Sequence, residues 1–187
     1  MLFSDQPIRN FVDAIMLFGA CMEPRKERVV IRLNRSIERR RSLAWLVATL
    51  LQHGIDIKLC DTANDDVIVY RTEGMMFMRR EYERWYDALG KHMPADVHVT
   101  TPLLVVWSVE ALSGSSSKTA DDKVWYHLPA FHDPLVLDRM VRDAAGLGFQ
   151  LRLNADGVFF QGREELGLLV SDYAPRAAWD VEMAVEV

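Results

Sequence analysis

Four arginines gather in the first half of the chain, at Arg35, Arg39, Arg40 and Arg41. Residues four apart share one face of a helix, so Arg35 and Arg39 are expected to lie on the same side. A helix is expected to begin at residues 34–36, and free N–H groups at a helix start bind phosphates. Because three consecutive arginines cannot all be buried unpaired, at least two are expected to be exposed or paired. The cluster predicts a contact surface for a protein partner, an anion or a nucleic acid. The alternative is a solvated face that pairs with Glu38 and with the acidic second half of the chain.

The other candidate chemistry is sparse. His127, His132 and Asp133 form the tightest group of metal-ligand types, but one falls on an expected strand and two in a loop, which is not a usual metal-site spacing. Cys60 precedes Asp61, whose negative charge disfavours a reactive thiolate. No phosphate-binding glycine loop, nucleophile elbow or metalloprotease helix is present in the sequence. We therefore expect no catalytic residue, no metal and no cofactor, and a chain that is not an enzyme.

The elements that must position these residues recur along the chain. Residues 28–73 and 123–164 both read as strand, helix, glycine, strand, turn, strand. Each first strand opens with a base, and the strand after each glycine carries a base at its fifth position, Lys58 in one copy and Arg152 in the other. The sequence therefore predicts an α+β fold of two similar units packed as one compact body.

Further elements flank these two units. The expected elements are a helix over Pro7–Gly19, a polar linker over 23–27, a helix at about 76–93, and strands at 166–170 and 179–187. Residues 103–109 are strongly β-branched and favour a central strand, with a helix ending at Gly114 as the alternative. The serine-rich stretch 113–122 is expected to be a flexible linker between an N-terminal unit, 1–112, and a C-terminal unit, 123–187.

Charge is distributed unevenly along the 187 residues. The chain carries a net charge of −5, composed of +2 over residues 1–95 and −7 over residues 96–187. An acidic total disfavours a general nucleic-acid coat protein, although a local basic patch in the first half stays open. The start of the chain lacks the features of a secretory leader, and two cysteines do not make a disulfide framework. A cytoplasmic protein without membrane contact is expected.

The stretch from Leu43 to Met93 resembles, in its apolar spacing and in Gly54, the small docking domains of modular biosynthetic enzymes, which grip a partner helix. The duplicated units are also similar in plan to small-molecule effector domains. These observations favour a non-catalytic regulatory protein that binds a macromolecular partner, most simply another protein. Nucleic-acid binding through residues 35–41 is the alternative, and a sensor of a small effector molecule or an unrecognised enzyme is the third possibility.

Overall fold

A computed structural model describes residues 8–17, 19–36, 40–60, 67–112, 123–126, 134–154, 157–161 and 163–173. The first half contains three helices, a four-stranded sheet and a small hairpin: α1 (Ile8–Leu17), β1 (Cys21–Arg25), β2 (Arg28–Ser36), α2 (Arg40–Gln52), β3 (Ile57–Cys60), β4 (Val67–Thr72), α3 (Arg79–Trp85), β5 (Tyr86–Asp87) and β6 (Gly90–Lys91). The second half contains three helices and a three-stranded sheet: α4 (Thr101–Leu112), β7 (Lys123–Tyr126), α5 (Pro134–Gly146), β8 (Gln150–Asn154), β9 (Gly157–Gln161) and α6 (Arg163–Tyr173).

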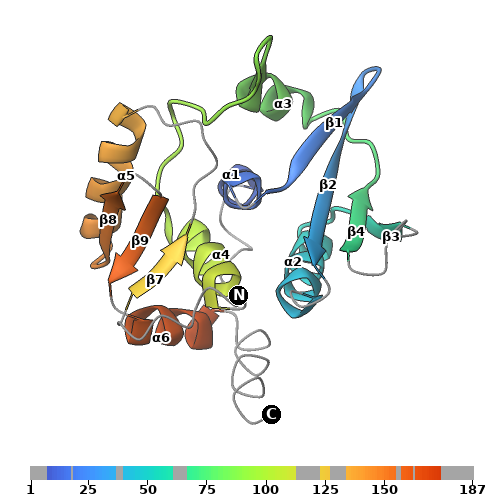
Figure 1. Cartoon of the computed structure of the whole chain (residues 1–187). Coiled ribbons are helices and arrows are strands. Elements are labelled where there is room, and N and C mark those ends of the chain that lie inside the picture. Colours follow the sequence, from blue (N-terminus) through green and yellow to red (C-terminus); the bar gives the residue numbers. More distant parts are fainter. Residues whose placement is uncertain are drawn as a thin grey trace.

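The predicted α+β class and its two repeated units are confirmed. In the first unit the strand order is β2-β4-β3, and in the second it is β7-β9-β8, with every neighbouring pair antiparallel. In both units a helix, α2 or α5, connects the first strand to the following hairpin (Figure 1). The similarity extends further than predicted, because a helix precedes each unit, α1 or α4, and another follows it, α3 or α6.

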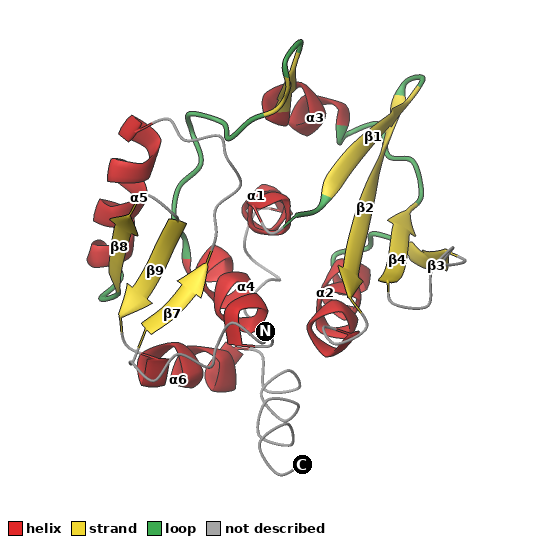
Figure 2. Ribbon diagram, in the orientation of Figure 1, coloured by secondary structure: helices red, strands yellow, loops and turns green. Residues whose placement is uncertain are grey.

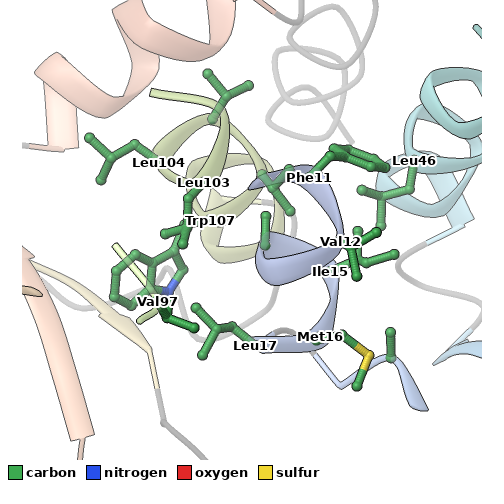
Figure 3. Packing of buried hydrophobic residues seen from close by; sticks show 14 of the residues in the cluster. Phe11, Val12, Ile15, Met16, Leu17, Leu46, Val97, Leu103, Leu104 and Trp107 are labelled. Atoms are coloured by element: carbon green, nitrogen blue, oxygen red, sulfur yellow. The ribbon is translucent and has the colours of Figure 1, made fainter. Parts of the chain in front are cut away.

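Helices α1 and α4 contact each other and lie between the two sheets (Figure 2). Residues Phe11 to Leu17 of α1 are all buried. Their neighbours include Leu46 of α2 and Leu103 and Trp107 of α4 (Figure 3). One apolar cluster therefore joins the two halves through this helix pair.

The strand favoured at 103–109 is wrong, because these residues form α4. Pro102 and every residue from Leu103 to Val109 are buried, so this stretch of the helix is buried on all sides and shows no polar stripe for a sequence pattern to detect. It packs against both α1 and α6. Its start is set by Thr100, whose side-chain oxygen accepts a long hydrogen bond of 3.4 Å from the Leu103 N–H, and by proline in the first turn.

Three other local expectations are also corrected. The polar linker at 23–27 is mostly β1, whose Met22 pairs with buried Ile31 at a sheet edge that tolerates Pro24. The strand at 166–170 is part of α6, because Leu166, Leu169 and Val170 are buried at helical spacing. The helix at 76–93 is shorter than expected, since α3 ends at Trp85 and the β5–β6 hairpin follows.

The linker at 113–122 and the strand at 179–187 lie outside the described residues, so the proposed division into 1–112 and 123–187 stays a prediction. Within the described ranges, no helix is long and apolar enough to cross a membrane.

Candidate nucleic-acid interface

Arg35 does not belong to the helix that was predicted to carry the arginine cluster. Arg35 lies near the end of β2, which runs to Ser36 because Arg35 and Ser36 pair with Ile68 and Val67 of β4. Arg35 is only 6% exposed, and its Nη1 donates a hydrogen bond to the Asn34 carbonyl at 2.8 Å. Helix α2 begins at Arg40, so the expected common face for Arg35 and Arg39 is wrong.

Arg39 lies outside the described residues, as do the side chains of Arg40 and Arg41. Their predicted exposure and their role in binding therefore stay predictions.

A different set of cations lies together on the four-stranded sheet. Strand side chains alternate between faces, and Val29, Ile31 and Leu33 of β2 are buried on the face that packs against α2. The intervening residues of β2 and their partners on neighbouring strands lie on the opposite face. We call this the basic face and define it by its cations: Arg25, Arg28, Arg32, Lys58 and Arg71.

Three of these cations form a row across neighbouring strands. Arg71 of β4 pairs directly with Arg32 of β2 on one side and with Lys58 of β3 on the other. Directly opposed residues have Cβ atoms about 5 Å apart, so like charges in such a row repel and destabilise the isolated sheet. The side chains remain accessible, from 33% for Arg32 to 73% for Lys58.

Carboxylates offset only part of this charge. Glu23 lies 3.2 Å from Arg25, 3.4 Å from Arg32 and 3.8 Å from Arg71, while Glu73 accepts a 2.8 Å hydrogen bond from Lys58. That hydrogen bond and the Lys58 charge lower the pKa of Glu73, and the same contact raises the pKa of Lys58. With Asp56 beside Lys58, three carboxylates face five cations, so the local charge is +2 on a chain whose total is −5.

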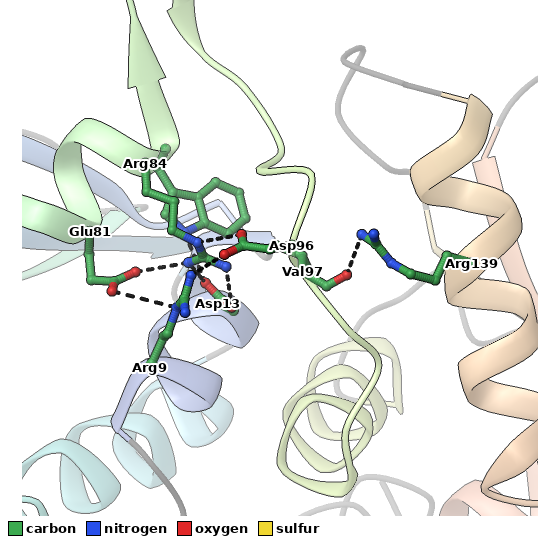
Figure 4. Close-up of polar contacts among 8 residues, drawn as sticks. Arg9, Asp13, Glu81, Arg84, Asp96, Val97 and Arg139 are labelled. Atoms are coloured by element: carbon green, nitrogen blue, oxygen red, sulfur yellow. Dashed lines mark hydrogen bonds and ion pairs between the residues drawn. The ribbon is translucent and has the colours of Figure 1, made fainter.

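A second charged cluster has a structural role. Asp13 of α1 is buried and accepts hydrogen bonds from both Nη atoms of Arg84, one at 2.8 Å, and from Trp85 Nε1 at 3.0 Å. Arg84 also reaches Glu81 at 2.8 Å and Asp96 at 2.6 Å, and Arg9 pairs with Asp96 (Figure 4). The network joins α1 to α3 and to the segment before α4, so these charges support the fold.

Lys91 closes the end of α1. Its Nζ donates to the carbonyls of Met16 at 2.5 Å and Ala20 at 2.8 Å, which is the favourable position for a cation relative to the helix dipole. Burial lowers the Lys91 pKa to about 8, an effect opposed by Cys21 and reinforced by Arg35. This buried amine serves the helix end and does not extend the basic face.

The remaining predicted site types gain no support. His127, His132 and Asp133 lie outside the described residues, and the part of the chain that is described holds no group of three metal-ligand side chains. Cys21 and Cys60 are free, partly exposed thiols. A hollow of about 440 Å³ lies between α5 and β8, within one unit, and Phe149 is its aromatic lining residue.

The sequence already contained the signal for the basic face. Arg28 opens the first repeat and Lys58 is the base at its fifth strand position, so both were visible as repeat positions. Their meeting with Arg32 and Arg71 depends on the β2-β4-β3 register, which joins residues distant in sequence. The three arginines at 39–41 are consecutive in the sequence, so their proximity can be seen without knowing the fold.

Comparison with known proteins gives similarity at the level of structure. No family model and no curated protein sequence matches the chain. A solved structure, the homing endonuclease I-WcaI bound to its DNA recognition sequence, superposes with a TM-score of 0.58 at 10% identity, covering 87% of this chain and 78% of the other. At this identity the likeness establishes a shared fold.

This likeness corrects the expectation that the chain is not an enzyme, because the fold is shared with an endonuclease, which is one. It also leaves the resemblance of residues 43–93 to docking domains without support. The structural neighbour itself is bound to its DNA recognition sequence.

Proposed function

We propose that the chain binds double-stranded DNA through the basic face of the sheet β1-β2-β4-β3. The observation that carries the proposal is the row Arg32–Arg71–Lys58, three accessible cations directly opposed across three strands. Glu23 and Glu73 offset only part of the positive charge of the row, and phosphates would offset the rest, because bound cations replace counterions on DNA.

The geometry fits a duplex. Adjacent strands lie about 4.8 Å apart, so a row across three strands spans about 10 Å, comparable to the roughly 12 Å width of the major groove. Arginine also binds phosphate and guanine through two parallel hydrogen bonds, which suits Arg32 and Arg71. The fold shared with a DNA-bound homing endonuclease supports the same assignment.

The earlier leading expectation, a protein partner, stays a prediction, as do the cytoplasmic location and the contribution of Arg39, Arg40 and Arg41. No contact among the described residues bears on them.

The test compares two variants with the wild type on a pool of short random-sequence duplexes. Arg32→Gln/Lys58→Gln/Arg71→Gln removes the row, and Arg142→Gln/Arg152→Gln removes two exposed cations from the acidic half. Fluorescence anisotropy at low salt is expected to show an affinity loss on the order of tenfold or more for the row variant and little change for the control. Because the fold is shared with an endonuclease, the same samples with Mg²⁺ are examined for strand scission.

Unchanged affinity of a folded row variant would remove the basic face from the interface. Absence of DNA binding by the wild type would overturn the proposal itself.

A further inference from the structure

A short turn beside the basic face presents two apolar side chains to solvent. It follows β4, where Met76 and Phe77 are 63% and 58% exposed. The residues on either side are held in place: Met78 is fully buried and Met75 packs against the core. The turn therefore displays two apolar side chains between two anchored methionines.

Hydrogen bonds fix this turn at both ends. The Met75 N–H donates to the Val29 carbonyl at 2.9 Å, and the Val29 N–H returns a bond to Met75 at 3.1 Å. The Arg79 N–H donates to the Met76 carbonyl at 3.1 Å, and Arg79 Nη1 reaches the Lys26 carbonyl at 3.3 Å. The backbone of the turn is thus held against the β1–β2 turn, so binding has to order only the two exposed side chains and not the backbone that carries them.

The turn adjoins the basic face. Met75, which precedes the exposed pair, pairs with Val29, the direct neighbour of Arg28 on β2. Gly74 permits this approach, because a Cβ there would lie 3.0 Å from the Arg28 Cβ. The exposed pair therefore lies next to the end of the basic face that carries Arg28.

Cations surround the apolar pair. Lys26, Arg28, Arg79 and Arg80 are exposed, and the nearby carboxylates are Glu27 in the β1–β2 turn, Glu73 before Gly74, and Glu83, which pairs with Arg79 at 2.9 Å. Two side chains are far fewer than the roughly 20 residues per partner of a stable protein interface. Apolar side chains flanked by cations match the way DNA-bending proteins insert Phe or Met between base pairs while their basic groups hold the phosphates.

We infer that Met76 and Phe77 form an apolar wedge that enters a base step of the duplex bound by the basic face. This inference rests on the proposed function, since the wedge needs DNA held on the adjoining sheet. Insertion would partly unstack and kink the duplex, so the protein would distort DNA as well as bind it.

The test measures distortion and affinity separately. Closed circular plasmid is relaxed by a topoisomerase with saturating protein, then deproteinised, and its linking number is read on a gel. Wild type is expected to shift the linking number, because unstacking untwists the duplex. Met76→Ser/Phe77→Ser should lose most of that shift while its plasmid affinity stays within about threefold, since phosphate contacts dominate affinity.

The matched control is Leu135→Ser/Leu168→Ser, which removes two apolar side chains of similar exposure, 78% and 60%, from the other half. This control should keep both the shift and the affinity. A wild type that binds plasmid without any shift, or a wedge variant with an undiminished shift, would overturn the wedge while leaving DNA binding intact.

Flotation with phosphatidylglycerol vesicles tests the competing possibility that the turn binds a lipid surface. Vesicle binding that is present in wild type and lost in Met76→Ser/Phe77→Ser would assign the turn to membranes and overturn the inference. A wild type that fails to bind plasmid would remove the proposed function and the wedge together.

Discussion

The two halves of the molecule share a topology and differ in surface charge and in the contacts of their central helices. Strand order is the same in both units, but the halves carry +2 and −7. Helix α1 keeps one charged residue, Asp13, in an otherwise apolar buried stretch and binds α3 through it, whereas α4 is buried on every side over residues 102–109 and packs on α6. Similar apolar spacing is enough to build the same unit twice, and the exposed positions are left free for different chemistry.

The difference between the central helices predicts the largest effect. Asp13→Ala leaves Arg84, whose side chain is only 13% exposed, without its bidentate partner, and Trp85 Nε1 without an acceptor. Removing one member of a buried pair costs about 3–5 kcal/mol, and we expect about 3 because Glu81 and Asp96 still contact Arg84. Urea unfolding measures the loss.

Ser108→Ala in α4 is the control for the same measurement. The Ser108 hydroxyl only donates to the Leu104 carbonyl within its own helix, so about 1 kcal/mol or less is expected. Equal losses of unfolding free energy for the two variants would show that the Asp13–Arg84 pair stabilises the fold no more than a single hydrogen bond within a helix does.

Lys91 predicts a pH dependence specific to the end of α1. Its folded pKa of about 8 lies below the ordinary value of 10.5, so between these values the unfolded chain binds more protons. Stability therefore rises with pH across this window, by at most about 1.4 kcal/mol per pH unit from this group.

The measurement is the difference in unfolding free energy between wild type and Lys91→Met at several pH values from 8 to 10.5. Cys21 and Tyr86, whose pKa values are raised mainly by burial, are present in both proteins. The difference should shift in favour of wild type as pH rises; a constant difference would mean that Lys91 is not buried as described.

A smaller effect is expected where the second half meets the segment before α4. Asp143 of α5 accepts a hydrogen bond from the Val99 N–H at 3.1 Å and contacts His98. Asp143→Ala should cost about 1 kcal/mol. Asp138→Ala, which breaks only the exposed pair with Arg142, should cost less than about 0.5 kcal/mol when both variants are compared by urea unfolding.

The elements that the sequence predicted well are those with one polar side. Helices α2 and α5 each bury one stripe and present polar residues elsewhere, and the apolar residues of α1 are interrupted by Arg9, Asn10 and Asp13, so helical spacing was visible. Residues 103–109 show no periodic alternation of apolar and polar residues. A short apolar β-branched run of this kind is expected both in a buried strand and in a buried helix, so the sequence pattern does not distinguish them. Burial on all sides of α4 is a property of its neighbours α1 and α6, which local pattern does not contain.

The candidate site was less predictable than the fold. Arg35 seemed to belong with Arg39 because a helix was expected to start before it, but strand pairing with Ile68 extends β2 through this residue. The row Arg32–Arg71–Lys58 arises from pairing between residues up to 39 positions apart, and register at that range follows from the assembled sheet.

The salt dependence of DNA binding tests the central claim most directly. The logarithm of the binding constant falls with the logarithm of salt concentration by about 0.9 for each phosphate contact. If Arg32, Lys58 and Arg71 each hold a phosphate, their combined replacement by Gln should reduce the magnitude of that slope by about 2.7, whereas Arg142→Gln/Arg152→Gln should leave it unchanged. Equal slopes for wild type and the folded row variant would contradict the account that the basic face binds DNA.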